Sequence, residues 1–390
     1  MSDIIYMDNN ATTAVAPEVL EAMLPYLKDY YGNPSSMYDF AEMPAHALVR
    51  AREKVAALVG AHPEEIVFTS CGTESDSTAV FSALRRHPER NHIVTTRVEH
   101  PAIKNLCENL ENLTGRKYRV TRLPVAADGT LDLQQYKDAL TDDTAIVSVM
   151  WANNETGVLF PVLEMAEMAK ERGILFHTDA VQATGKVPMN LEKSAIDFLS
   201  CSGHKLHAPK GVGFLYVRKG APYMPFLNGG HQEHGRRAGT ENVAGVVALG
   251  RACELARANM ETENTKVRAL RDRLENGLLE RIPHSILNGH KTQRLPNTAN
   301  ISFEYVEGEA ILLHLNRHKI CASSGSACTT GSLEPSHVLR AMGVPFTAAH
   351  GSIRFSLSTY NTEAEVDKVL EVLPGIIANL RKLSPFWKEQ

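Results

Sequence analysis

Two stretches decide the fold: ILFHTDAVQ at residues 174–182 and FLSCSGHK at residues 198–205. In each, a short apolar run gives way to polar and charged residues, as happens where a strand ends at the edge of a sheet. Amphipathic helical patterns separate these runs from the other apolar runs of the first 256 residues. Continuous apolar strands that alternate with helices are typical of a parallel sheet covered on both faces. The sequence therefore predicts an α/β fold.

The pattern changes after about residue 256. We predict a large domain over residues 15–256 and a smaller α+β domain made of residues 1–14 and 257–390. The segment 321–335 is rich in Ser, Gly, Thr and Cys, lacks periodicity, and is predicted to be a mobile loop. The predicted strands lie at residues 65–69, 92–96, 145–151, 174–178, 198–200, 213–217, 300–304 and 352–357, and the predicted helices at 44–59, 77–86, 163–172, 264–281, 309–317 and 363–383.

Composition excludes several classes of protein. The 390 residues are 43% hydrophobic and 22% charged, as in ordinary soluble globular proteins. The net charge of −4 leaves no basic excess to favour nucleic acid or an anionic membrane as a partner. The N-terminus does not match a signal peptide, and no apolar run reaches the roughly 18 residues that a membrane span needs. We therefore expect a cytoplasmic protein whose six cysteines are reduced.

A lysine and an aspartate just after two of the strands give the first chemical signal. Lys205 can lie in a partly desolvated crevice, where a neutral amine attacks carbonyl groups. Asp179 falls at the carboxyl edge of the sheet, where it can pair with the protonated ring nitrogen of pyridoxal phosphate (PLP). Gln182, three residues on, can reach the ring hydroxyl. The alternatives are a solvated surface lysine and an aspartate that caps a helix.

The residues TSCGTESD at 69–76 join a predicted strand to a helix. Small residues allow backbone N–H groups to approach an anion, and a helix N-terminus favours negative charge there. Thr73 and Asp76 also match a capping box, which is compatible with anion binding. His100 follows another strand and can stack on a flat cofactor or transfer a proton, although a structural histidine is the commoner case.

Two residues of the C-terminal part carry further signals. Arg354 lies in a short strand pattern and can bind a carboxylate in two-pronged fashion, with a structural ion pair as an equal alternative. Cys328 lies in the predicted loop, where an exposed thiol can attack a substrate and carry a product away. An incidental surface cysteine is the alternative, and Cys71 in the predicted phosphate loop is a rival nucleophile. Cys321 follows an apolar residue and is expected to be buried.

Together these features resemble the cysteine desulfurases of the NifS and IscS type, within fold type I of the PLP-dependent transferases. The resemblance covers almost the whole chain and implies a mostly parallel seven-stranded sheet between helices, beside a smaller α+β domain. DNN at 8–10 and AAHG at 348–351 favour the NifS branch. The motifs that carry the resemblance are DNNATT (8–13), GNPSS (32–36), WANNETG (151–157), RAGTEN (237–242), SSGSAC (323–328) and LEPS (333–336).

The resemblance implies a role for each matching position. Lys205 would hold PLP covalently, His100 would stack on its ring, and Cys328 would become a persulfide. Asn154 and Arg354 would bind the carboxylate of L-cysteine. Thr240 would reach the phosphate of the other subunit, which implies a homodimer. The implied cofactor-binding residues are Gly72, Thr73, His100, Asn154, Asp179, Gln182, Ser202, His204, Lys205 and Thr240, and the implied catalytic residues are Cys328, Lys205 and His100.

The NifS branch further implies a supply of sulfur for iron–sulfur clusters, in particular those of nitrogenase, with a NifU-type scaffold as partner. The sequence offers no metal site of its own, and only Cys328 is expected to ligate a cluster, transiently, when it is shared with the scaffold. Two alternatives remain. Another PLP enzyme of this fold, such as a selenocysteine lyase or an aminotransferase, would keep Lys205 and Asp179 without needing Cys328. A non-catalytic sulfur carrier or scaffold would keep only the fold.

Overall fold

The computed structural model describes residues 4–113, 118–324, 335–385 and 387. Its centre is a seven-stranded sheet with the order β2-β8-β7-β6-β5-β3-β4. The pairs from β7 through β6, β5 and β3 to β4 are parallel, whereas β8 runs antiparallel to both of its neighbours. The strands are β2 (Ile66–Thr69), β3 (His92–Thr96), β4 (Arg119–Leu123), β5 (Thr144–Ser148), β6 (Leu175–Asp179), β7 (Phe198–Ser202) and β8 (Gly213–Val217).

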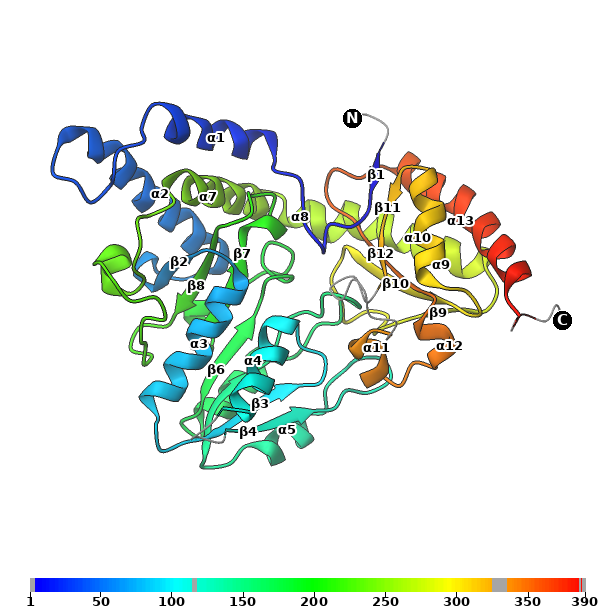
Figure 1. Cartoon of the computed structure of the whole chain (residues 1–390), viewed down its shortest axis with the longest axis horizontal. Coiled ribbons are helices and arrows are strands. Elements are labelled where there is room, and N and C mark those ends of the chain that lie inside the picture. The colour runs from blue at the N-terminus through cyan, green and yellow to red at the C-terminus, as the bar shows by residue number, and fades with distance from the viewer. Residues whose placement is uncertain (1–3, 114–117, 325–334, 386, 388–390) are drawn as a thin grey trace.

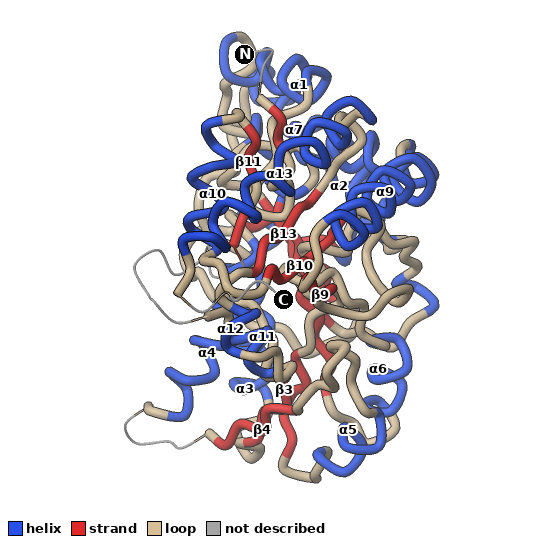
Figure 2. The backbone as a smooth tube through the Cα atoms, turned by 90° about the vertical axis from the view of Figure 1, so that its right-hand side faces the viewer, coloured by secondary structure: helices blue, strands red, loops and turns tan. Residues whose placement is uncertain are grey.

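Helices cover both faces of this sheet, which confirms the predicted α/β class. Figure 2 shows β3 and β4 with α3 and α4 on one side and α5 and α6 on the other. Every residue of β2, β3, β5, β7 and β8 is buried, as expected for strands covered twice. The helices are α1 (Pro17–Lys28), α2 (Glu42–Val59), α3 (Gly72–Arg86), α4 (Pro101–Glu111), α5 (Leu133–Ala139), α6 (Val162–Lys170) and α7 (Val243–Ala258).

A second, antiparallel sheet of four strands lies beside the first, in the order β12-β13-β10-β9. Its apolar side chains pack with those of α9, α10 and α13 in a separate core. Figure 1 shows these helices beside the strands of the small sheet. The short α8 and a π-helical turn (Glu263–Val267) lead from α7 into α9. The elements are α8 (Met260–Thr262), α9 (Arg268–Arg281), β9 (Ser285–Leu287), β10 (Thr298–Phe303), α10 (Gly308–Arg317), β12 (Ser323–Ser324), α11 (His337–Ala341), α12 (Phe346–Ala349), β13 (Ser352–Ser356) and α13 (Glu363–Leu383).

The N-terminal segment joins the two sheets. Its first strand, β1 (Ile5–Tyr6), pairs in parallel with β11 (Ile320–Cys321). The backbone N–H of Asn9 then donates to the carbonyl oxygen of Ser356 at the end of β13, and that of Thr13 donates to His204 next to the large sheet. Residues 8–13 therefore run from the edge of the small sheet to the carboxyl end of the large one.

The loop prediction for residues 321–335 is wrong at its beginning. Cys321 pairs in β11, and Ser323 and Ser324 pair with β13, so the chain is still in strands there. Cys321 is also partly exposed rather than buried. Residues 325–334, including Cys328, lie outside the described residues. Within the described ranges, no helix combines the length and the apolar character needed to cross a bilayer.

Candidate active site

A cavity of about 300 Å³ lies where the carboxyl ends of β6 and β7 meet the N-terminus of α3 and residues 8–13. This is the edge at which open α/β sheets bind ligands. The structure brings together almost all of the residues singled out in the sequence. The cavity is lined by Gly72, Thr73, His100, Asn154, Asp179, Gln182, Ser202, His204, Lys205 and Arg354, as well as by Asn10, Ala11, Cys71, Asp76, Met150, Ala152 and Val181.

Thr240 is the described site residue that does not line the cavity; its side chain is exposed. The segment that precedes it is nevertheless tied to the site. Arg237 forms a two-pronged ion pair with Glu74 in the first turn of α3, at 2.9 and 3.2 Å. Thr240 is therefore exposed on a segment that an ion pair fixes to α3, the helix whose N-terminus lines the cavity.

Lys205 lies in a 3₁₀ turn (Gly203–Lys205) that directly follows β7. Its Nζ donates to the backbone carbonyl oxygens of Asn10 and Ala11, at 2.5 and 2.6 Å. The alternative of a solvated surface lysine is therefore wrong. The contact with Asn10 and Ala11 was missed from the sequence, because nearly two hundred residues separate the partners and no local pattern signals their meeting.

Asp179 ends β6 and is 6% exposed. Its Oδ1 accepts a hydrogen bond from the backbone N–H of Val181 at 3.0 Å. Burial and the neighbouring carboxylate of Asp76 together raise the pKa of Asp179 to about 6, against the opposing effect of His100. A buried carboxylate of this kind is stabilised by a cation placed against it. The protonated ring nitrogen of PLP is such a cation.

Gln182 supplies an unpaired acceptor at the same end of the cavity. Its Nε2 donates to the carbonyl oxygen of Asn10 at 2.9 Å. Its Oε1 is buried and has no hydrogen-bond partner among the described residues. Leaving a buried carbonyl unpaired costs about 1–3 kcal/mol, so a ligand hydroxyl at this position would be stabilised. The ring hydroxyl of PLP fits that need.

The N-terminus of α3 suits an anion. The helix begins at Gly72 with Cys71 as its N-cap, and no described side chain caps it. The predicted capping box of Thr73 and Asp76 is wrong, because the helix starts before Thr73 and places both residues inside its first turns. Uncapped N–H groups and the helix dipole favour a phosphate here. A Cβ on Gly72 would lie 2.8 Å from Cγ2 of Val181, so glycine allows the start of α3 to pack closely against Val181.

Two imidazoles line the cavity near this helix. His100 is the N-cap of α4, and its Nδ1 accepts the backbone N–H of Ala102 at 3.2 Å. A neutral His100 therefore carries its proton on Nε2. The Nδ1 atom of His204 forms a hydrogen bond of 3.1 Å with the hydroxyl group of Thr12. Burial and the charges of Lys205 and Lys210 lower the pKa of His204 to about 4, so it is neutral at pH 7. His100 therefore has the structural role that is common for a lone histidine, as the cap of α4, and it also lines the cavity.

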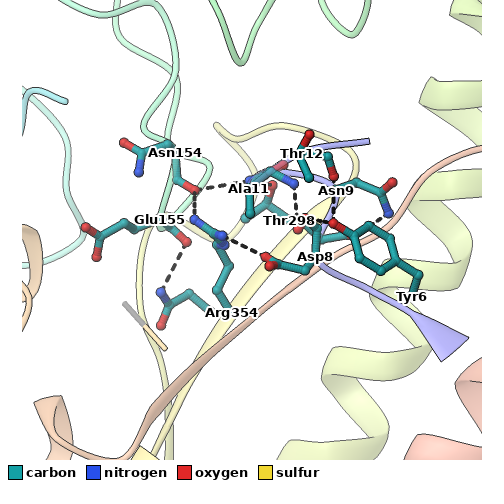
Figure 3. A network of polar contacts seen from close by, with 12 residues as sticks. Tyr6, Asp8, Asn9, Ala11, Thr12, Asn154, Glu155, Thr298 and Arg354 are labelled. Atoms are coloured by element: carbon teal, nitrogen blue, oxygen red, sulfur yellow. Dashed lines mark hydrogen bonds and ion pairs between the residues drawn. The ribbon is translucent and has the colours of Figure 1, made fainter. Parts of the chain in front are cut away.

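Arg354 lies on β13 with 4% of its surface exposed. Its guanidinium donates to the carbonyl oxygen of Asn154 at 3.0 Å and to Oδ1 of Asp8 at 2.8 Å (Figure 3). Arg354 thus forms a structural ion pair, which was one of the two alternatives considered from the sequence. It keeps spare donors, because its Nε is buried without a partner in the described part of the chain. A bound carboxylate can satisfy such donors.

Three independent features of the cavity therefore fit PLP. The buried carboxylate of Asp179 can pair with a cation, Oε1 of Gln182 can accept a hydrogen bond, and the uncapped N-terminus of α3 at Gly72 can bind a phosphate. No group of three or more His, Cys, Asp or Glu side chains within the described ranges is placed to hold a metal ion.

Comparison with known proteins agrees with this geometry. The model of the class-V aminotransferase family matches residues 5–369. The cysteine desulfurase NifS of Azotobacter vinelandii is 59% identical over 388 residues, which cover 99% of this chain and 96% of that protein. A cysteine desulfurase of Trichormus azollae is 60% identical over 387 residues, with the same coverage. A solved NifS-like protein superposes with a TM-score of 0.90 at 38% identity and covers 97% of this chain and 100% of its own.

The match of the family model over most of the chain, the full-length relatives and the shared fold lead to one conclusion: the chain belongs to the class-V aminotransferase family.

Proposed function

We propose that this protein is a PLP-dependent cysteine desulfurase that converts L-cysteine to L-alanine and keeps the sulfur as a persulfide on Cys328. The observation that carries the proposal is the meeting of Lys205, Asp179 and Arg354 in one cavity, although they come from three separate strands or turns. The amine, the acid and the guanidinium are the groups needed for a PLP ring and an amino-acid substrate. Relatives described as cysteine desulfurases, 59–60% identical over 99% of the chain, support the choice of substrate.

The cofactor, when bound, supplies an electron sink that makes the substrate's Cα proton acidic. The chain's own residues do the rest. Lys205 holds the cofactor through Nζ and then takes the Cα proton at the same atom. Asp179 holds the ring nitrogen protonated. The uncapped N–H groups of Gly72 and Thr73, with Ser202 and His204, hold the phosphate.

Other residues bind the substrate and accept its sulfur. Arg354 and Asn154 orient the substrate carboxylate, and His100 covers the ring and assists proton transfer through Nε2. The Cys328 thiolate attacks the sulfur of L-cysteine. The S–Cβ bond of the substrate breaks, Cβ gains a proton, and L-alanine and the Cys328 persulfide result. Atoms balance: one L-cysteine and one thiol give one L-alanine and one persulfide, without an external oxidant or reductant.

The described residues on either side of Cys328 support its reach into the site. Ser323 in β12 lies opposite Arg354 in the sheet register. On the other side, the hydroxyl of Ser336 donates to Oε2 of buried Glu155 at 2.5 Å. Glu155 follows Asn154, which lines the cavity. Both ends of the segment 325–334 are thus anchored beside the substrate-binding residues.

The proposal includes a wider setting. The enzyme works as a homodimer in the cytoplasm, with Thr240 of each subunit at the phosphate of the other, which suits its exposure and its tie to α3 through Arg237. The large domain spans residues 15–256, and the small domain comprises 1–14 with 257–390. The sulfur goes to an iron–sulfur scaffold of the NifU type, in keeping with the NifS relative of Azotobacter vinelandii. Cys328 serves as a transient ligand there.

The direct test is turnover. Purified protein loaded with PLP is expected to release L-alanine and, with a thiol reductant, sulfide from L-cysteine in equal amounts. Alanine is measured by chromatography and sulfide by a colorimetric assay. A yellow protein that instead transaminates L-cysteine, or that acts on selenocysteine alone, would assign the site to another PLP enzyme of the fold. A protein that does not bind PLP would leave only a sulfur carrier or scaffold.

Replacement of Arg354 tests substrate binding. Arg354→Gln removes the charge and is expected to raise the KM for L-cysteine by about 10–100-fold, because a hydrogen bond to a charged group contributes about 1.5–3 kcal/mol. PLP content should not change. Asp8→Asn is the matched control, since it removes only the ion pair with Arg354. If both variants raise KM equally, the ion pair rather than substrate contact explains the effect.

A further inference from the structure

A second carboxyl group lines the same cavity, and no step described above uses it. Asp76 lies in α3 and lines the cavity, yet only 1% of its surface is exposed. Its Oδ1 has no hydrogen-bond partner among the described residues. Asp76 and Asp179 belong to different elements and line the same cavity, close enough for each charge to affect the other. Two buried acids therefore face one ligand site.

The surroundings of Asp76 do not supply a positive charge to balance it. His177 Nε2 lies 3.5 Å from Asp76 Oδ1, but burial lowers the pKa of His177 to about 4, so it is neutral at pH 7. Hydroxyl groups hold His177 on both sides: Ser148 at Nδ1 and Ser200 at Nε2, each at 2.9 Å. Ser200 also hydrogen-bonds Asp76. The polar environment of Asp76 is thus neutral on the side of the sheet.

The other titratable groups that act on Asp76 come from α4 and the segment before it, and from β6. They are His100, whose charge would favour ionised Asp76, and the acids Glu99 and Asp179, whose pKa values an ionised Asp76 would raise. Glu99 is itself buried, and burial raises its pKa to about 8. Asp76, Glu99 and Asp179 are all buried in this part of the core, where like charges do not ionise together at low cost.

We propose that Asp76 is a positioning residue that keeps its proton in slightly acidic solution, so that the single negative charge of the acid pair stays on Asp179, against the ring nitrogen. This inference rests on the proposed function. Like charges that share a buried site cannot both ionise, and the better-solvated partner ionises first. Asp179 is that partner, because it accepts the Val181 N–H and is the less buried of the two. Burial, offset in part by Ser200, raises the pKa of Asp76 to about 7.

Asp76→Asn tests the proposal, because asparagine matches a protonated aspartate in shape and neutrality. The variant is expected to bind PLP with a dissociation constant within about threefold of the wild type and to show the same visible absorbance band at pH 6.5. Asp179→Asn removes the charge at the ring nitrogen and is expected to lose affinity and to change the band. Asp197→Asn is the control: this partly buried aspartate directly precedes β7, accepts a hydrogen bond from the backbone N–H of Phe176 and does not line the cavity.

The apoprotein gives a second readout that does not depend on the cofactor. The pKa of Asp76 in the folded chain is above its value of 3.8 in an unfolded chain. The folded state therefore loses stability as pH rises from about 4 to 7, and Asp76→Asn removes this loss. Relative to the wild type, the melting temperature of the variant should be equal near pH 4 and higher by a few degrees at pH 7.5. A purely structural side chain would give a difference that does not vary with pH.

The outcomes separate the two proposals. If the wild type does not bind PLP, the proposed function fails. If the wild type binds PLP but Asp76→Asn weakens binding tenfold or more, or lowers the melting temperature equally at all pH values, Asp76 carries a charge or acts only in packing, and the inference is wrong. If the variant does not fold, infrared spectra of wild-type apoprotein with ¹³C-labelled aspartate decide. A protonated carboxyl stretch that is lost with a midpoint near pH 7, separate from transitions of Asp179 and Asp197 near pH 6, supports the inference, and its absence overturns it.

Discussion

Cys328→Ser is expected to stop sulfide and alanine release from L-cysteine, with a fall in turnover of at least about 10³-fold. A serine hydroxyl is not ionised at neutral pH and does not take up sulfur, whereas a cysteine thiolate does. The variant should keep its bound PLP and its visible absorbance, because the residues that hold the cofactor are unchanged. Persulfide on the protein, measured by mass spectrometry after incubation with L-cysteine, should disappear with the activity.

Two other cysteines are the matched controls. Cys321 is partly exposed seven positions before Cys328, and Cys71 lines the cavity itself. Cys321→Ser and Cys71→Ser should each retain persulfide formation on Cys328. If Cys71→Ser abolishes persulfide and Cys328→Ser does not, the nucleophile is Cys71 and the assignment of Cys328 is wrong.

Lys205→Ala is expected to remove both the covalent attachment of PLP and the base for the Cα proton. Turnover should fall by at least about 10²–10⁴-fold from the loss of proton transfer alone. Borohydride reduction, which fixes PLP to its lysine in the wild type, should leave the variant unlabelled. Tandem mass spectrometry of the reduced wild type should place the label on Lys205.

Lys210→Ala supplies the control, because Lys210 lies five residues further in the same loop and is exposed. It should keep both the label and the activity. A label that stays on the Lys205→Ala protein would show that another lysine holds the cofactor. The buried Lys186 would then be examined first.

The sequence predicts the strands well because they are buried on both faces. β3 and β8 begin and end where their apolar runs do, and β2, β5, β6 and β7 deviate by only a few residues. β4 was not predicted, since its sequence RVTRL carries two arginines, as an edge strand can. The antiparallel direction of β8 was also not visible, because direction depends on the connection and not on the residues of a strand.

The site could be predicted as a set of residues but not as an arrangement. Asp179 and Lys205 follow strands of a sheet whose carboxyl edge is a known binding position, so their proximity follows from the fold. The link from Lys205 to Asn10 and the pair of Arg354 with Asp8 depend on where the N-terminal segment crosses the molecule, which no local pattern states. Asp76 was interpreted as part of a cap because the start of α3 was placed too late.

The path of residues 8–13 has a consequence for how the protein is made. Asp8 meets Arg354 and Asn10 meets Lys205, partners that leave the ribosome long after the first dozen residues have emerged. The proposed PLP site is therefore complete only after β13 has been synthesised. A nascent chain that stops before β13 would lack Arg354, the partner of Asp8.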